Sequence, residues 1–299
     1  MATALTLDTS YAGKYAGEYL RAAFLANESL QHVTVKENID WRAVVKRLTD
    51  DIAFEAPTCD FAPLGEIAVE ERWITLKKFQ IQRNICKNDF LSDWPAGDYQ
   101  KGNIEAALSE NIIANMLEGM AAYNETTLWT GNGSLATQYD GLLRLMGADA
   151  TVITPAAVAI TTGNVFAQLQ VVIDAAPLAV KNANEKPMLY LSNDVWEKYM
   201  FASAAVGGNG WYSFGGPEVP KTYLGMYQIV VCGGLPANTI LFMRKSNAWF
   251  GTNLVSDWNN IQVVDMGQFA EENVRFSAKF FAAAQYGIGS EIVAYSTWF

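Results

Sequence analysis

The stretch that decides the fold runs from Gly102 to Leu143, GNIEAALSENIIANMLEGMAAYNETTLWTGNGSLATQYDGLL. Its first part places apolar residues three or four positions apart, the spacing of one helix face. These residues are Ile104, Leu108, Ile112, Met116, Met120 and Tyr123. Asn103 can cap the start, and Gly131-Asn132-Gly133 supplies the flexible backbone that a helix stop needs. The pattern predicts one unbroken helix from about Asn103 to Leu128, with residues 104–120 supplying its core-facing side chains.

The composition indicates a protein with large subunit contacts. Of the 299 residues, 51% are hydrophobic and only 17% are charged, below the roughly 25% typical of soluble proteins. Such a chain has more apolar surface than a monomer needs. No apolar run is long enough to span a membrane, and the N-terminus lacks the basic start and apolar core of a signal peptide. We therefore expect no membrane association.

The charge balance argues against a protein that grips nucleic acid through its phosphates. The formal net charge is −10, from 21 Lys and Arg against 31 Asp and Glu, whereas phosphate binding needs a basic surface. The three cysteines, Cys59, Cys86 and Cys232, lie far apart with no CxxC motif. They favour a reduced compartment over a disulfide framework.

The region before the long helix divides into an arm and a strand-like segment. Residues 1–51 are polar with a short amphipathic start and predict an N-terminal arm. Within residues 52–100, apolar residues then occupy alternate positions over some twenty residues, namely Ile67, Val69, Trp73, Phe79, Ile81 and Ile85. This run exceeds a usual strand, so we expect a long β-hairpin that finds cover on a neighbouring subunit. The alternative is an ordinary hairpin inside the core.

The region after the long helix predicts a mixture of helices and short strands, and hence an α+β fold. We expect a strand at 151–155, a helix at 164–176, a strand at 187–191 and a helix from there to Met200. Short strands follow at 227–232, 239–243, 248–251 and 261–264. The strongest alternation in the chain begins at Asn273, where the apolar positions are Val274, Phe276, Ala278, Phe280, Ala282 and Ala284.

The sequence resembles the major capsid proteins of tailed bacteriophages, which have the Hong Kong 97-like fold. A long helix is followed by an acidic residue, two apolar residues, GxG, a polar spacer and an Asp-Gly-Leu-Leu strand start. The matching residues are Glu125, Leu128, Trp129, Gly131, Gly133, Gly141, Leu142 and Leu143. The order of the later segments, from Leu224-Gly225 through Ile240-Leu241 to Glu291-Ile292-Val293, is also similar to the family.

The resemblance implies a division of the chain and a set of contact residues. The implied parts are an N-terminal arm at 1–51, an extended loop (a β-hairpin) at 52–100, a peripheral domain with the spine helix at 101–160, an axial domain at 161–246 and return strands of the peripheral domain at 247–299. In the family the extended loop reaches across the next subunit. The subunit contacts implied here are Trp73, Lys77, Lys78, Phe79 and Ile81.

The function implied by the resemblance is structural. Copies of the chain would form pentamers and hexamers of an icosahedral shell that encloses double-stranded DNA without specific binding. The expected partners are further copies, a portal protein and decoration proteins, and the expected location is the virion, after assembly in the bacterial cytoplasm. The alternatives are an encapsulin-like compartment shell and a hydrolase that uses scattered carboxylates.

No residue pattern supports catalysis, a cofactor or a metal. The single histidine, His32, lies in a polar stretch with no nucleophile beside it, and it cannot form a zinc site with scattered cysteines. The doublets Glu70-Glu71 and Glu271-Glu272 lie on strands, where adjacent side chains point to opposite faces. Some shells of this fold cross-link a Lys to an Asn of the next subunit. Lys77 and Lys78 lie in the corresponding broad region, but neither the Asn nor the activating carboxylate can be aligned residue by residue, so we do not carry this reaction over. We therefore expect no enzyme activity.

Overall fold

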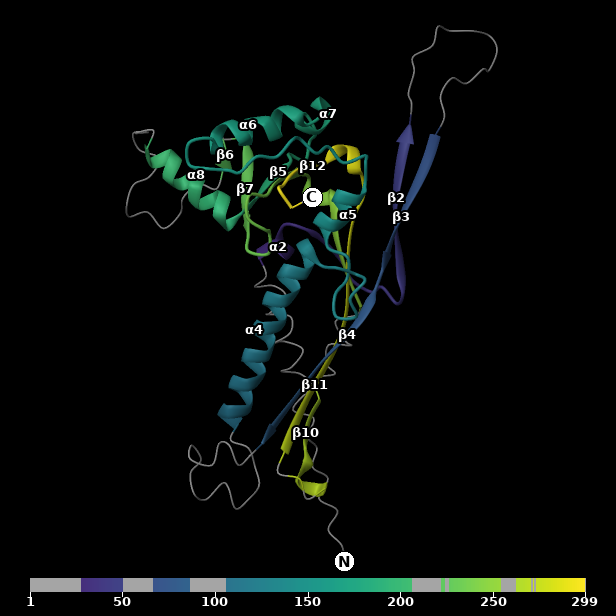
Figure 1. The fold of residues 1–299 in the computed structure, drawn as a ribbon. Helices are drawn as coiled ribbons and strands as arrows, with labels where there is room; N and C mark the ends of the chain where they lie inside the picture. The colour runs from purple at the N-terminus through teal and green to yellow at the C-terminus, as the bar shows by residue number, and fades with distance from the viewer. Residues whose placement is uncertain are drawn as a thin grey trace, which may run out of the picture.

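The computed structural model describes residues 28–50, 67–86, 106–205, 222–223, 226–253, 262–269, 271 and 273–298. Helices and sheets are mixed along the chain, so the expected α+β class is confirmed. A body of two sheets and several helices occupies the centre of the molecule (Figure 1). The long helix α4, the long strands β4 and β11 and the short strand β10 extend from this body in one direction, and the β2–β3 hairpin extends in another (Figure 1).

The long helix is present as one continuous element, α4 (Ala106–Thr130). It ends two residues later than predicted, and the predicted start at Asn103 and Ile104 lies outside the described residues. Met120 is buried, as expected for the core-facing side. The side chains of Leu108, Ile112 and Met116 also lie outside the described part, so their burial stays a prediction. Tyr123 is 47% exposed, and its hydroxyl donates to the carbonyl of Thr137.

The first sheet is built around its longest strand, β11 (Asn273–Tyr286). Its other strands are β1 (Thr34–Lys36), β4 (Lys77–Cys86), β9 (Ala248–Thr252) and β10 (Gln262–Asp265). Strand β11 pairs with β4 from Asn273 to Ala282, with β10 at one end and with β9 at the other, all antiparallel. The predicted alternation is confirmed, since Phe276 and Ala278 are buried while Arg275 and Lys279 are exposed. Over residues 273–279 one face of the strand is therefore apolar and the other polar, whereas toward β9 both faces are buried, as the consecutive Ala282, Ala283 and Ala284 show.

The second sheet lies under a layer of helices. Its strand order is β12-β8-β5-β7-β6, where the strands are β5 (Met188–Ser192), β6 (Thr222–Tyr223), β7 (Tyr227–Cys232), β8 (Ile240–Met243) and β12 (Val293–Tyr295). The helices of this part of the chain are α6 (Val165–Ala175), α7 (Leu178–Lys181) and α8 (Asn193–Ala205). Apolar residues of α6 and α8, including Leu169 and Val195, pack on Leu189 and Phe242 of the sheet.

The hairpin differs from the prediction in its strands. It consists of β2 (Arg42–Asp50) and β3 (Ile67–Thr75), paired antiparallel along their whole length. The segment 42–50 therefore belongs to the hairpin and not to the arm. The predicted second half of the run, β4, instead pairs with β11 in the first sheet. The division at residues 51 and 52, and the hairpin at 52–100, are wrong because the alternating run contains two strands with different partners, separated at Leu76.

Three shorter predictions are also wrong. The Asp-Gly-Leu-Leu segment starts a helix, α5 (Leu142–Ala148), in which Leu142, Leu143 and Met146 are buried on one side. The predicted strand at 151–155 is reduced to a single bridge between Ile153 and Val293. The closing strand β12 pairs with β8 of the second sheet, so it does not return to the first sheet as the 247–299 division implied. All three residues of β12 are buried, so its sequence shows no alternation from which its place in a sheet could be predicted.

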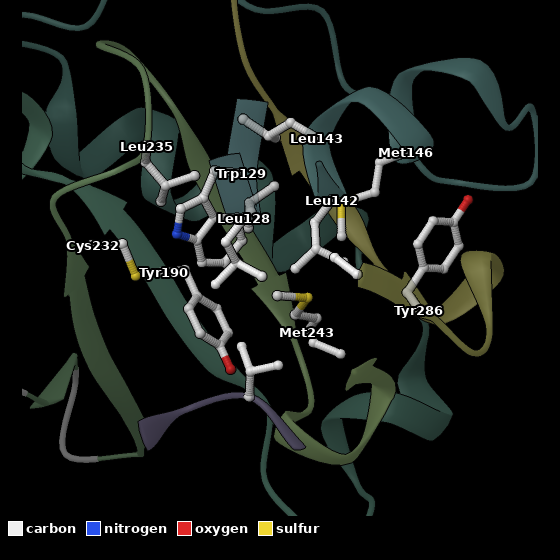
Figure 2. Close-up of a cluster of buried hydrophobic side chains, with 14 of the residues drawn as sticks. Leu128, Trp129, Leu142, Leu143, Met146, Tyr190, Cys232, Leu235, Met243 and Tyr286 are labelled. Carbon is white, nitrogen blue, oxygen red and sulfur yellow. The ribbon is translucent and has the colours of Figure 1, made fainter. Parts of the chain in front are cut away.

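The main core joins the end of α4 to both sheets. Leu128 and Trp129 insert between α5 and the second sheet, against Leu142, Tyr190 and Met243 (Figure 2). Trp129 and Tyr190 lie with ring centroids 5.8 Å apart, and both side chains are fully buried. The remaining short elements are α2 (Glu28–Gln31) and the 3-10 helices at Lys245–Asn247, Met266–Phe269 and Gly289–Glu291.

Candidate functional site

The loop after α4 depends on glycines because backbone segments approach each other closely there. The amide of Gly131 donates to Thr127 O at 3.0 Å, and the amide of Gly141 donates to Gly131 O at 3.0 Å. A Cβ on Gly131 would lie 2.5 Å from Thr127 O and in contact with Tyr139 O. A Cβ on Gly141 would lie 2.5 Å from Gly131 N. The sequence predicted a flexible backbone here, whereas the structure shows that glycine is needed because a side chain would overlap neighbouring backbone atoms.

Glu125 connects three segments at the end of the spine helix. Its carboxylate accepts a hydrogen bond from the Ser29 hydroxyl of α2 and one from the Gly234 amide, at 3.3 Å, in the turn after β7. Ser29 Oγ in turn accepts from Trp129 Nε1 at 2.8 Å. Among the described residues, the second carboxylate oxygen, Oε2, is buried without a hydrogen-bond partner. Burial raises the pKa of Glu125, and the hydrogen bonds from Ser29 and Gly234 oppose this rise only in part.

We expect Glu125→Gln to stabilise the chain at neutral pH. Because the folded-state pKa of this carboxyl group lies above its unfolded value, the folded chain binds the proton more tightly. Its stability should therefore be highest below about pH 4.3, fall by up to about 1.4 kcal/mol per pH unit above that, and level off beyond the folded-state pKa. Glutamine keeps an acceptor for Ser29 and Gly234 and removes the charge. Urea unfolding between pH 4 and pH 8 measures the difference between the two chains.

The control for this substitution is Glu118→Gln, since Glu118 is exposed on the same helix. We expect the stability of this variant to equal that of the parent chain at every pH, because removing the charge of an exposed carboxyl group changes the free energy of unfolding little. A Glu125→Gln chain that is less stable than the parent at pH 7 would mean that the ionised carboxylate is a net stabilising group.

Lys77, at the start of β4, is bound within its own subunit. Its ammonium group donates to the carbonyl oxygens of Gly133, at 2.9 Å, of Gln138, at 2.7 Å, and of Leu135. A lysine ammonium has three N–H donors and no acceptor, so these three bonds use its whole donor capacity. The structure therefore assigns Lys77 to the loop after the spine helix, where the sequence predicted a subunit contact.

The other predicted contact residues divide between the surface and the core. Trp73 is 51% exposed and Lys78 is also exposed. Phe79 instead packs inside the subunit, with ring centroids 5.4 Å from Phe280 and 6.1 Å from Tyr139. Ile81 is half-buried beside Ala278 of β11. The expectation that Trp73, Phe79 and Ile81 share one exposed face is wrong, because the outward side changes at Leu76.

The hairpin presents one face to the body and one away from it. Strand register places Ala43 opposite Ile74, and both are buried against the body at the base of the hairpin. The opposite face, which we call the outer face, carries Val44, Val69 and Trp73 together with the ion pair Lys46–Glu71. Val69 is 56% exposed, and Arg42 lies 6.0 Å from the ring of Trp73. Nothing in the described part of the chain covers this apolar strip.

An ionic cluster that the sequence did not predict holds the base of the hairpin. Arg72 of β3 donates to Asp149 Oδ2 at 2.5 Å, and its guanidinium lies 4.4 Å from the ring centroid of Tyr286. The Tyr286 hydroxyl donates to the same carboxylate oxygen at 2.7 Å. Burial alone would raise the pKa of Asp149, but the hydrogen bonds from Arg72, Tyr286 and Thr151 outweigh it and lower the pKa. Asp149 therefore stays ionised across the physiological range.

Three further observations concern metal binding, membrane spanning and the single histidine. Among the described residues, no group of His, Cys, Asp or Glu side chains could hold a metal ion. No helix within the described ranges is both long enough and apolar enough to cross a bilayer. The His32 carbonyl accepts from the Tyr190 hydroxyl at 2.6 Å, which places the histidine segment against the second sheet. The main surface feature is the β2–β3 hairpin, which is attached to the body through Arg72 and Asp149 and whose outer face is partly uncovered.

Comparison with solved structures identifies the fold. No protein-family model matches the sequence, and no curated protein matches it. A chain of the satellite phage P4 procapsid superposes with a TM-score of 0.60 at 8% identity, over 93% of this chain and 89% of its own length. The capsid of an empty GTA particle gives 0.58 at 12% identity, over 90% and 89%. The structure of Gordonia phage Cozz gives 0.58 at 13% identity, over 89% and 84%.

These similarities extend over nearly the whole of each chain. This protein therefore has the Hong Kong 97-like capsid fold, as the resemblance implied. At identities of 8 to 13%, the similarity is one of fold and does not extend to function. The function has to be argued from this chain's own surfaces.

Proposed function

We propose that this protein is the major capsid protein of a tailed bacteriophage, which self-assembles into an icosahedral shell around double-stranded DNA. The fold and the phage particles with similar structures support this proposal. The chain acts as a structural protein in the virion and has no catalytic role. Its mechanism is the association of identical copies as pentamers and hexamers.

The observation that carries the proposal is the uncovered outer face of the β2–β3 hairpin. A two-stranded sheet is only marginally stable by itself, and exposed Val69 and Trp73 lie on the side turned away from the body. Both side chains are already about half buried, so completing their burial is worth on the order of 3 kcal/mol before ordering costs. A second copy of the same chain supplies the cover, since repeated identical contacts build a closed shell.

The remaining parts of the subunit take their roles from the same arrangement. The spine helix α4 and the first sheet form the peripheral domain, in which β4 and β11 run beside each other over ten residue pairs. The second sheet, with α6 and α8, forms the axial domain that makes the rings. Rings then join through the peripheral domain, the hairpin and the N-terminal arm. Assembly takes place in the bacterial cytoplasm, and a portal protein and decoration proteins complete the particle.

We expect the shell to hold its DNA without gripping it. The chain carries a net charge of −10, and the stretch 102–128 contains four Glu and no Lys or Arg. Empty particles should therefore bind added duplex DNA weakly, and raising the salt concentration from 50 to 200 mM should remove what binds. A filter-binding titration at the two salt concentrations measures this. Tight binding that survives 200 mM salt would contradict the expectation.

The contents of native particles distinguish the proposal from its alternative. An encapsulin-like compartment would hold cargo protein, whereas a capsid holds the phage genome. Particles purified from infected cells should protect double-stranded DNA of one defined length from nuclease. Particles that contain protein cargo and no protected DNA would overturn the phage assignment while leaving shell formation intact.

A further inference from the structure

The loop between α4 and α5 contains an Asn-Gly pair, Asn132-Gly133, whose reacting groups are all contacted by neighbouring residues. In such a pair the backbone nitrogen of the glycine can attack the side-chain carboxamide of the asparagine, because no Cβ on the glycine hinders the approach. The reaction closes a succinimide ring and releases ammonia. It needs a base at the attacking nitrogen, a donor at the carboxamide oxygen and a close approach of the two groups.

Asp140 supplies a base at the attacking nitrogen. The Gly133 amide donates to Asp140 Oδ1 at 2.9 Å, so the carboxylate already contacts the proton that must be removed. The carboxylate also packs directly on this glycine, since a Cβ on Gly133 would lie 2.6 Å from Oδ1. Arg144 lies 3.6 Å from the same oxygen in an exposed ion pair, which contributes little to holding it. Asp140 is thus placed to act as a general base.

The Ser134 amide supplies the donor at the carboxamide oxygen. It donates to Asn132 Oδ1 at 3.0 Å, which closes an Asx turn and folds the carboxamide back toward the amide of the next residue. When the Gly133 nitrogen attacks, negative charge develops on Oδ1. A backbone N–H that already donates to this oxygen stabilises that charge.

Further hydrogen bonds fix the loop in which these groups lie. The Asn132 amide donates to Gln138 Oε1 at 2.9 Å, and the Asn132 carbonyl accepts from the Leu135 amide at 3.0 Å. The Gly133 carbonyl accepts from the Lys77 ammonium at 2.9 Å. The fold therefore holds the reacting groups near one another, which is the condition under which intramolecular reactions are fast.

We propose that Asn132-Gly133 is a self-modification site, at which Asp140 is the catalytic residue for succinimide formation. Asp140 takes the proton of the Gly133 amide, the nitrogen bonds to Asn132 Cγ, and the bond from Cγ to the side-chain amide nitrogen breaks. The proton on Asp140 passes to the departing nitrogen, which leaves as ammonia, and the carboxylate is restored. Water then opens the ring at either carbonyl, which gives aspartate or isoaspartate in place of Asn132.

Either product changes the loop between the spine helix and α5. A negative charge appears beside Asp140, and like charges repel each other. Isoaspartate also lengthens the backbone by one carbon, which shifts the Gly133 carbonyl relative to Lys77. The inference does not rest on assembly of the chain, so its failure leaves the proposed function untouched.

The first test compares the folded and unfolded full-length chain. Purified chain is incubated at neutral pH, with and without urea, and peptide mass spectrometry follows the conversion of Asn132 to aspartate and isoaspartate. In urea the contact with Asp140 is lost. We expect Asn132 to react at least about ten times faster in the folded chain than in the unfolded one. A folded rate equal to or below the unfolded rate would overturn the proposal.

The second test is Asp140→Ser, which removes the base and keeps a polar group near the Gly133 amide. A second Asn-Gly pair, Asn209-Gly210, also follows a glycine and serves as the reference within the same chain. We expect the rate at Asn132 to fall by about tenfold or more, while Asn209 reacts as in the parent.

The direction of the change separates catalysis from a structural role. If Asp140 only held the loop, its loss would loosen the loop and raise the rate at Asn132. An unchanged or faster reaction in Asp140→Ser, with parental helix content by circular dichroism, would therefore contradict the catalytic role. If this variant does not fold, the comparison of the folded and unfolded parent chain still decides the question.

Discussion

Removing the outer part of the hairpin should leave a folded subunit that no longer assembles. The change replaces residues 46–71 with Asn-Gly, which joins the cross-strand pair Val45 and Arg72 through a two-residue turn. It keeps the buried Ile74 and Arg72, so the body retains its core contacts and the hydrogen bond from Arg72 to Asp149. It deletes Val69 and half of the outer face but keeps Trp73, so it removes about half of a contact energy of about 3 kcal/mol per subunit, a loss repeated at every contact in the shell. Sedimentation velocity should show small species in place of particles.

The control is the double substitution Lys46→Gln and Glu71→Gln, which removes an exposed ion pair from the same face. Its side chains are 66% and 39% exposed, so we expect little effect on assembly. Circular dichroism of the shortened chain should match the parent. An unfolded shortened chain would place the hairpin in the subunit's own core, and normal particles would show that the outer face does not join subunits.

Gly131→Ala should strongly destabilise the subunit because the added methyl group meets backbone atoms. Its Cβ would lie 2.5 Å from Thr127 O, in the last turn of α4, and in contact with Tyr139 O, in the buried part of the loop before α5, so the added methyl group meets backbone on both sides. We expect a loss of about 3 kcal/mol, at the upper end of overpacking effects, and poor recovery of soluble chain. The urea midpoint of the purified chain measures the loss.

Gly119→Ala, within α4 itself, is the matched control for the glycine that follows the helix. Nothing lies within 4 Å of a Cβ at Gly119, and alanine favours helix over glycine by about 1 kcal/mol. We expect this variant to be slightly more stable than the parent. If Gly131→Ala were as stable as Gly119→Ala, the close approach in the loop would not be what requires glycine there.

The parts of the fold that the sequence predicted are those in which burial follows a regular period. Strand β11 alternates because one side of it is buried along its length, and α4 is long enough for its helical period to be distinct. Strand β2 was missed because Arg42, Lys46 and Arg47 interrupt its apolar residues, and it was assigned to the arm. Helix α5 was missed because two adjacent leucines fit a strand start as well as a helix.

The candidate contact site was only partly predictable for a different reason. Trp73 is exposed and Phe79 is packed inside the subunit because the buried side of the chain changes at Leu76. The apolar residues keep the same alternate spacing on both sides of Leu76, so the sequence pattern does not reveal this change. The partners of Lys77 are backbone carbonyls, which every residue possesses, so no side-chain pattern identifies them. Arg72 meets Asp149 and Tyr286 only because three distant segments come together in the fold.

Electron microscopy of the full-length chain, expressed alone and purified, tests shell formation most directly. We predict closed, roughly spherical particles, each built from many copies and separating from smaller species on a sucrose gradient. A chain that stays a monomer or a small oligomer under all assembly conditions, with its hairpin face accessible to solvent, would contradict the account.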